Sequence, residues 1–279
     1  MTGTPEQFVL EYSKFTEDNR LLFLMADLYK AMNEGDPDWQ NFPWRNIMVL
    51  DSEGAQQAVA ESIGLEPEQF TTLKKQWAWD KSNDILVHDN AITKLLEMRL
   101  GLGLYADSPR CFWGPGSGLS KYKKKTGVIC IESGDTNKKT IYLKNKIETI
   151  TEGSIKCFSA HEQNGFDNWL NYCNNNDGDS IYITHDKDMT GKNNPWINWG
   201  WFSLNMNSVI RANQGLGRFI RKLLNKLGIN LKPNVYIFFD NPETALTVNL
   251  DPLEAVSTNP GATYQTAKDI KTIATYWLE

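Results

Sequence analysis

The sequence lacks the features that would place it in or across a membrane. No stretch reaches the roughly 18 uninterrupted apolar residues that a spanning helix needs. The first residues, MTGTPEQFVLEYSKFTEDNR, contain no basic segment followed by an apolar run, so no secretory signal is expected. These absences predict a cytoplasmic protein with no membrane partner.

Cysteine is scarce, and its spacing excludes two common uses. The four cysteines form no Cys-x-x-Cys pair and are too few for a disulfide framework. Only Cys157 and His161 are close in sequence among the residues that could ligate zinc, and the others considered are Cys173 and His185. We therefore expect reduced, mostly buried thiols and no bound metal.

Two catalytic motifs are also missing. The stretch WGPGSGLSK superficially suggests a phosphate loop, but it lacks the Gly-Lys-Ser/Thr ending whose lysine and hydroxyl serve phosphate and magnesium. No Gly-x-Ser-x-Gly nucleophile elbow occurs. The net charge of -5 argues against a general attraction to nucleic acid, so any such binding must depend on a local basic patch.

The patterning predicts an α+β protein in two parts. The 279 residues are 41% hydrophobic and 11% aromatic, enough for a substantial core. Apolar residues recur at helical spacing from Phe8 to about Tyr105, which predicts an all-helical domain over residues 1–106. Prolines, glycines and lysines then indicate a linker over 107–126, before a domain over 127–279.

Short β-branched runs dominate this second domain. We predict strands in TGVICIESG, KKTIYLKN, GSIKCFSA, DSIYITHD, WINWGWFSLNM, NVYIFFD and ALTVNL. Helices are expected in FDNWLNYCN and in the closing ATYQTAKDIKTIATYWLE. Successive short strands with few helices between them predict a mixed or antiparallel sheet.

The stretch NQGLGRFIRKLLNKLG carries the leading functional hypothesis. Gly215 and Gly217 precede a predicted basic amphipathic helix that buries Phe219, Ile220, Leu223, Leu224 and Leu227 and ends at Gly228. A glycine-lined helix entrance can hold a pyrophosphate through backbone N–H groups. Over Gln214–Gly228 the sequence resembles the acetyl-CoA-binding segment of GNAT acetyltransferases.

That resemblance implies an acyltransferase that transfers an acetyl group to a small-molecule or peptide amine. Its implied cofactor is acetyl-CoA, bound by Gln214, Gly215, Leu216, Gly217 and Arg218. For proton transfer we select His185 and Asp186, a titratable imidazole and a carboxylate at the end of a predicted strand. The same residues would also be typical of a polar hairpin loop with no catalytic role.

Two non-enzymatic hypotheses remain open. Four lysines, Lys121, Lys123, Lys124 and Lys125, surround Tyr122, and such a basic-aromatic cluster can bind single-stranded nucleic acid. Residues 54–77 resemble a helix-turn-helix unit, with Glu66 near the cap of the second helix and Pro67 in its first turn. The aromatic stretches Trp39–Trp44 and Trp196–Trp201 could instead be interface anchors of an oligomeric assembly protein.

Overall fold

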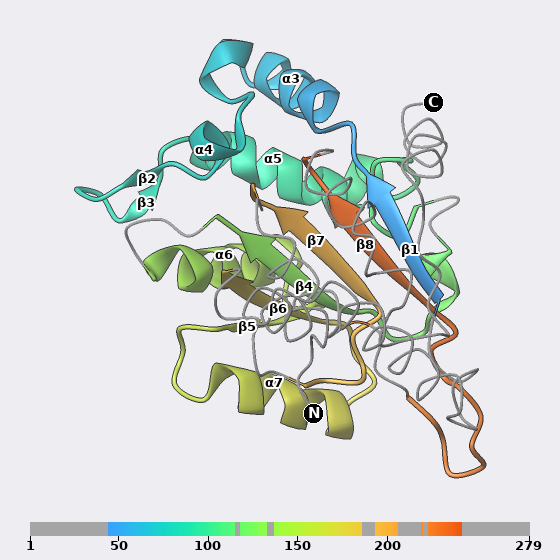
Figure 1. The fold of residues 1–279 in the computed structure, drawn as a ribbon. Helices are drawn as coiled ribbons and strands as arrows, with labels where there is room; N and C mark the ends of the chain where they lie inside the picture. The colour runs from blue at the N-terminus through green and yellow to red at the C-terminus, as the bar shows by residue number, and fades with distance from the viewer. Residues whose placement is uncertain are drawn as a thin grey trace, which may run out of the picture.

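The core of the protein is a parallel β-sheet. The structure is a computed structural model that describes residues 44–114, 118–132, 137–185, 193–205, 219 and 223–241. Six strands form the sheet in the order β1-β8-β7-β4-β6-β5 (Figure 1). Their bounds are β1 Trp44–Val49, β4 Thr126–Ile131, β5 Lys156–Ser159, β6 Ser180–His185, β7 Trp199–Ser203 and β8 Asn234–Phe239. Each neighbouring pair runs parallel.

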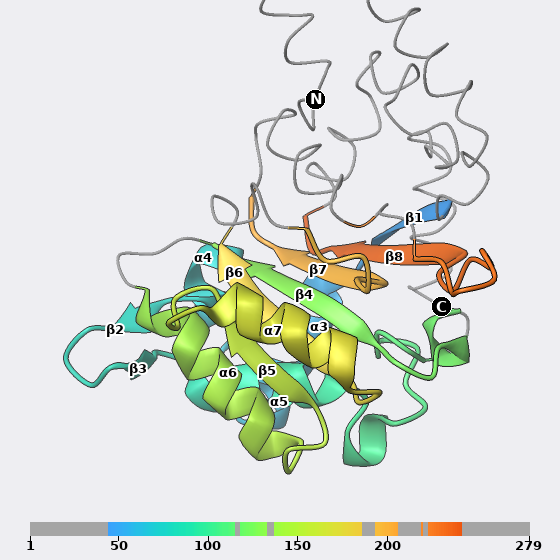
Figure 2. The same ribbon diagram turned by 90° about the horizontal axis from the view of Figure 1, so that it is seen from below.

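Helices cover both faces of this sheet. Figure 2 shows α5 (Asp89–Arg99) and α6 (Lys138–Ile150) on the same side of the strands. These helices and α3 (Ser52–Ser62) bury apolar residues against one face, whereas α7 (Gly165–Asn175) packs against the other. Strand β4 contributes to the apolar clusters on both faces of the sheet. Ile129 packs in the cluster with α5 and α6, and Val128 packs in the cluster with α7.

Several predicted elements are confirmed. Strands occur in TGVICIESG, GSIKCFSA, DSIYITHD, WINWGWFSLNM and NVYIFFD, and a helix occurs in FDNWLNYCN. The combination of helices and sheet is therefore confirmed, but the predicted mixed or antiparallel pairing is wrong for the six-stranded sheet, whose neighbouring strands are all parallel.

The strand predicted in KKTIYLKN explains that error. These residues begin helix α6, whose buried Thr140, Leu143 and Ile147 recur every three or four residues. A helix between β4 and β5 creates a crossover connection, and a crossover joins parallel strands, whereas a direct strand-to-strand link favours an antiparallel hairpin. One misread element thus changed the expected pairing of the sheet.

The first part of the chain contributes to the same sheet. Residues 1–43, which carry most of the predicted N-terminal helices, lie outside the described residues. Trp44–Val49 forms β1 and pairs with β8, so this stretch is a strand and not part of a helix, contrary to the prediction. Helices α3 and α5 share one apolar cluster with the sheet. The division at 107–126 stays a prediction, and the elements expected at 245–250 and 262–279 are not described.

The predicted helix-turn-helix unit is incomplete. Helix α3 is present, Glu66 is the N-cap of the next element, and Pro67 lies in its first turn as expected. That element is the three-residue 3-10 helix η2 (Pro67–Gln69), and the following α4 (Leu73–Gln76) has a single turn. Neither is long enough to act as a recognition helix in a major groove.

The remaining described elements are short. An antiparallel pair is formed by β2 (Trp79–Asp80) and β3 (Ile85–Leu86), and two further 3-10 helices are η3 (Gly103–Tyr105) and η4 (Leu119–Lys121). Within the described part of the chain, no helix combines the length and apolar character needed to cross a bilayer.

Candidate functional site

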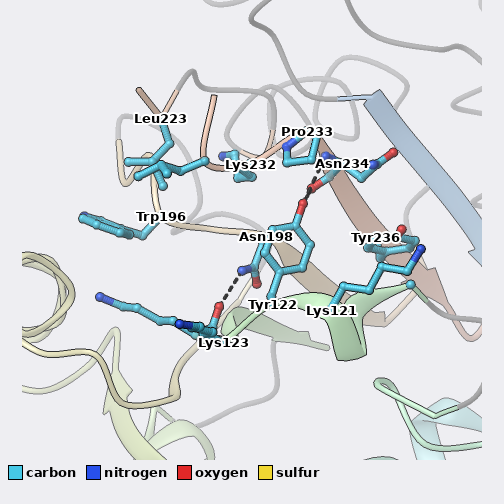
Figure 3. Close-up of a pocket in the computed structure, with 13 residues that line it drawn as sticks. Lys121, Tyr122, Lys123, Trp196, Asn198, Leu223, Lys232, Pro233, Asn234 and Tyr236 are labelled. Carbon is cyan, nitrogen blue, oxygen red and sulfur yellow. Dashed lines mark hydrogen bonds between the residues drawn. The ribbon is translucent and has the colours of Figure 1, made fainter. Parts of the chain in front are cut away.

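A cleft of about 490 Å³ opens beside the amino ends of β4, β7 and β8. Its walls come from segments that are distant in the sequence: residues 118–124, residues 196–198 and residues 223–236 (Figure 3). The lining combines four lysines with three aromatic residues: Lys121, Lys123, Lys124, Lys232, Tyr122, Trp196 and Tyr236. None of the described residues that line it is acidic.

Tyr122 joins two walls of this cleft. Its hydroxyl donates to the carbonyl of Asn234 at 2.8 Å and accepts from the backbone N–H of Asn234 at 3.1 Å (Figure 3). Burial raises the pKa of Tyr122 to about 12, so the hydroxyl keeps its proton at neutral pH. The two hydrogen bonds between Tyr122 and Asn234 fix the segment before β4 against the first residue of β8.

Asn198 fixes the third wall. Its side-chain oxygen accepts from the backbone N–H of Thr126 at 3.0 Å, and its amide nitrogen donates to the carbonyl of Lys124 at 2.8 Å. Its own carbonyl accepts from the backbone N–H of Tyr236. One buried asparagine therefore connects the three segments. Its hydrogen bonds fix the positions of the cleft walls relative to one another.

The predicted lysine cluster divides into two pairs. Lys121 and Lys123 are exposed, and neither ammonium group has a hydrogen-bond or ion-pair partner among the described residues. They are therefore available to a ligand. A strongly hydrated, mobile ammonium group of this kind suits contact with phosphate oxygens.

Lys124 and Lys125 instead hold the protein together. Lys124 donates to the carbonyls of Cys173 and Asn176 at the end of α7 and lies over the ring of Trp196, 4.1 Å from its centroid. Burial lowers its pKa. Lys125 pairs with Asp179, 3.6 Å between Nζ and Oδ2. Two lysines of the sequence cluster thus have no partner among the described residues, and the other two contact other parts of the protein.

Gly118 allows Tyr236 to line the cleft. Its φ of +68° is a left-handed conformation, and a Cβ at this position would lie 2.1 Å from the Tyr236 hydroxyl oxygen. Glycine meets both requirements, because it tolerates positive φ and leaves room for the phenol.

The predicted helix over Gln214–Gly228 is wrong where the structure describes it. Phe219 is fully buried as expected, but residues 223–231 form a turn in which Leu224 and Asn230 make an antiparallel bridge. Leu227, predicted to be buried, is 82% exposed. Gly228, with φ +74°, lies in this turn and does not end a helix.

The predicted catalytic and cofactor residues lie elsewhere or are not described. His185 ends β6 at the opposite edge of the sheet, is 1% exposed, and has Nδ1 3.2 Å from the carbonyl of Ile131. Asp186 and residues 214–218 lie outside the described residues. A role for His185 and Asp186 in proton transfer stays a prediction. Among the described residues, no group of three or more potential ligands could hold a metal ion.

Sequence reasoning missed the residues that assemble the cleft. Asn198 lies just before β7 and Asn234 begins β8, and in the sequence both look like ordinary loop asparagines. The sequence suggests only an assembly interface for Trp196. The usable signal is that each lies at or just before the amino end of a strand of the same parallel sheet. Parallel strands bring their amino ends to one edge, but that inference requires the pairing and order of the strands.

Comparisons with known proteins identify only distant structural likeness. No family model matches the chain, and no curated protein matches it. Among solved structures, it is similar to the ATP-dependent Type ISP restriction-modification enzyme LlaBIII bound to DNA, with a TM-score of 0.43 and 17% identity. The likeness covers 77% of this chain and 13% of that one, so the chain spans a small part of that enzyme.

Two further structures show similar weak likeness. The C-terminal part of the Fun30 ATPase domain gives a TM-score of 0.37 at 10% identity, covering 71% of this chain and 85% of that one. The S. cerevisiae protein Dbp5 bound to RNA and ADP BeF3 gives 0.37 at 12% identity, covering 88% and 46%.

The acetyltransferase hypothesis is wrong. No acetyltransferase is among the solved structures reported above. The six strands of the main sheet all pair in parallel, and the helix expected after the glycine loop is a turn from Leu223 onward. The acetyl-CoA cofactor and the amine acceptor, which were implied only by that resemblance, are therefore withdrawn as well.

Proposed function

We propose that this protein binds nucleic acid through the cleft at the amino edge of its sheet. One observation carries the proposal: Lys121 and Lys123 are exposed in a cleft that also presents Trp196 and Tyr236. Among the described residues, the two lysines have no partner and the cleft lining has no acidic side chain. Phosphates would contact the two lysines, and bases would lie against the aromatic rings.

The charge distribution supports this location. The whole chain carries a net charge of -5, so distributed charge would repel a polyanion and a local basic site is required. At the opposite edge of the sheet, Asp51 and Asp240 are paired with Arg110 and Arg99, so the described residues there offer no comparable pair of unpaired cations. The cleft is thus the better place for a phosphate backbone.

Titration of a fluorescent oligothymidylate, followed by anisotropy, tests the proposal. The variant Lys121→Gln/Lys123→Gln should bind more weakly. Because single-strand binding changes with log[salt] by about 0.7 per phosphate contact, its salt slope should be smaller by about 1.4. The matched control Lys74→Gln/Lys75→Gln removes two exposed lysines of α4 and should bind like the unmodified protein. Equal loss in both variants would refute a localised site.

A nucleotide is a second candidate ligand, at the carboxyl ends of β4 and β7. The chain after β4 enters α6 on one face of the sheet, whereas the connection after β7 places Phe219 in the cluster on the other face. This divergence between adjacent strands is a topological switch point, where open parallel sheets bind ligands. Glu132 and Asn205 lie at the two strand ends, joined by a 3.1 Å hydrogen bond.

Thermal unfolding with and without Mg²⁺-ATP tests this second candidate. We expect ATP to raise the melting temperature of the unmodified protein and of Lys121→Gln/Lys123→Gln, because those lysines lie at the other edge of the sheet. Asn205→Leu should lose the shift. The absence of any shift at millimolar ATP would reject the nucleotide site and leave the nucleic-acid proposal unaffected.

A further inference from the structure

Residues 223–231 form a turn with an exposed apolar tip, which we term the 223–231 loop. Leu227 is 82% exposed and Ile229 is 56% exposed, although both are large apolar side chains. Lys226 lies beside them and is also exposed. The two side chains lie two positions apart at one tip and so form a small apolar patch, which makes the tip a candidate contact surface only together with what lies beside it.

The loop is held rigidly by its own backbone and by Asn225. Its two sides are joined by hydrogen bonds from Leu231 N to Leu223 O at 2.8 Å and from Asn225 N to Ile229 O at 3.0 Å. The Asn225 side-chain oxygen accepts from the backbone N–H groups of Leu227 and Ile229, both at 2.9 Å. The tip is therefore preorganised, which lowers the entropic cost of binding.

The base of the loop is continuous with the cleft. Leu223 and Leu231 line the cleft together with Trp196 (Figure 3 labels Leu223 and Trp196). The following residue, Lys232, is buried and donates from Nζ to the carbonyls of Pro195 and Phe219, at 2.7 and 2.9 Å. This anchor fixes the loop to the segment that carries Trp196.

Charge favours nucleic acid as the occupant of this surface. The exposed cations at the cleft and tip are Lys121, Lys123 and Lys226, which would attract phosphates toward the loop. Leucine and isoleucine side chains can insert between bases and partly unstack them. An apolar protein partner would leave these three lysines without a complementary group.

We propose that the 223–231 loop contacts the bases of a nucleic-acid strand whose backbone lies in the cleft, and that this contact makes the protein prefer single strands to duplex. The inference rests on the proposed function, because Lys121 and Lys123 would bind the backbone of the same strand. In a single strand, Leu227 and Ile229 can reach unpaired bases. In a duplex, the same bases are stacked and paired, so access requires unstacking.

Binding to a single-stranded 12-mer and to a duplex of the same sequence tests the proposal. We expect Leu227→Asn/Ile229→Asn to weaken single-strand binding about tenfold, within the range for losing contact with one base, and to leave duplex binding unchanged. The control Val87→Asn/Leu104→Asn removes two exposed apolar residues outside the cleft lining and should change neither affinity. Circular dichroism of each variant confirms folding.

A second readout reports on the bases directly. An oligonucleotide containing 2-aminopurine should become more fluorescent on binding if the loop unstacks its bases, and the Leu227→Asn/Ile229→Asn variant should lose that increase at saturating protein. Unchanged single-strand affinity and fluorescence in this variant, with binding lost in Lys121→Gln/Lys123→Gln, would overturn the loop assignment alone. Undiminished binding in the lysine variant would instead overturn the proposed function. A dimer that dissociates in the loop variant would assign the tip to a second copy of the chain.

Discussion

Tyr122 and Asn234 exchange two hydrogen bonds across 112 positions of sequence, one in each direction between the phenol and the backbone. This pair joins the segment before β4 to the start of β8, and both residues line the cleft. The relative position of these two cleft walls therefore depends on the Tyr122 hydroxyl group, whether or not that group contacts a ligand.

Removing that hydroxyl should lower stability and loosen the cleft. In Tyr122→Phe the backbone N–H and carbonyl of Asn234 each lose this partner, at a cost of about 1–3 kcal/mol for partly buried groups. Urea unfolding measures this difference. The control Tyr105→Phe should change the free energy of unfolding by less than about 0.5 kcal/mol, as for most substitutions away from such contacts. Equal free energies of unfolding for the two variants would show that the two hydrogen bonds of the Tyr122 hydroxyl do not contribute to stability.

Stability should also fall at high pH through the same group. The pKa of Tyr122 is raised to about 12 in the folded protein, against about 10 for an unperturbed tyrosine. The unfolded chain therefore loses this proton first as pH rises. The contribution of Tyr122 is complete below about pH 10 and declines as pH rises toward about 12. Urea unfolding across this interval should show a shallower decline for Tyr122→Phe than for the unmodified protein.

The sequence was sufficient to locate most described strands but not to pair them. Buried runs such as those of β4 and β6 are recognisable as strands from composition alone. Both are buried along their whole length, which is typical of a sheet covered on two faces. That signal favoured parallel pairing, but treating KKTIYLKN as a strand concealed the crossover.

The functional residues were only partly predictable, for a related reason. The lysine cluster is visible as a basic run, yet the sequence does not show that Lys124 is committed to the end of α7 and Lys123 is not. The apolar spacing around Leu227 fits an amphipathic helix, but Asn225 and Gly228 stabilise a turn there instead. Tertiary contacts decide between such local alternatives.

Gly118 should be intolerant of a side chain, to a greater degree than another left-handed glycine. Gly118→Ala combines the cost of positive φ with a contact of 2.1 Å to the Tyr236 hydroxyl oxygen. Gly153→Ala is the matched control, because its φ of +75° imposes similar strain while nothing lies within 4 Å of the added carbon. We expect about 1–2 kcal/mol of destabilisation in the control and more in Gly118→Ala. Only Gly118→Ala should also weaken oligonucleotide binding.

The buried pair of Arg99 and Asp240 should be among the most sensitive positions of the fold. Both side chains are 2% exposed, and Arg99 NH2 lies 3.9 Å from Asp240 Oδ1. Asp240 also accepts from Ser52 Oγ and from Trp201 Nε1, which connects the carboxyl end of β8 to the start of α3 and to β7. Burial lowers the pKa of Arg99, and the nearby Asp240 carboxylate opposes that shift.

Asp240→Ala would leave the buried guanidinium without its carboxylate, so we expect a loss of about 3–5 kcal/mol in the free energy of unfolding. The exposed pair of Lys138 and Asp84 provides the comparison, since Asp84→Ala should cost no more than about 1 kcal/mol. Urea unfolding of both variants distinguishes the two environments. A double variant, Arg99→Met/Asp240→Leu, should recover part of the lost stability, because it removes both charges together. If it is instead less stable than Asp240→Ala alone, the guanidinium contributes through its hydrogen bond to the Arg110 carbonyl and its packing, and not through its charge pairing.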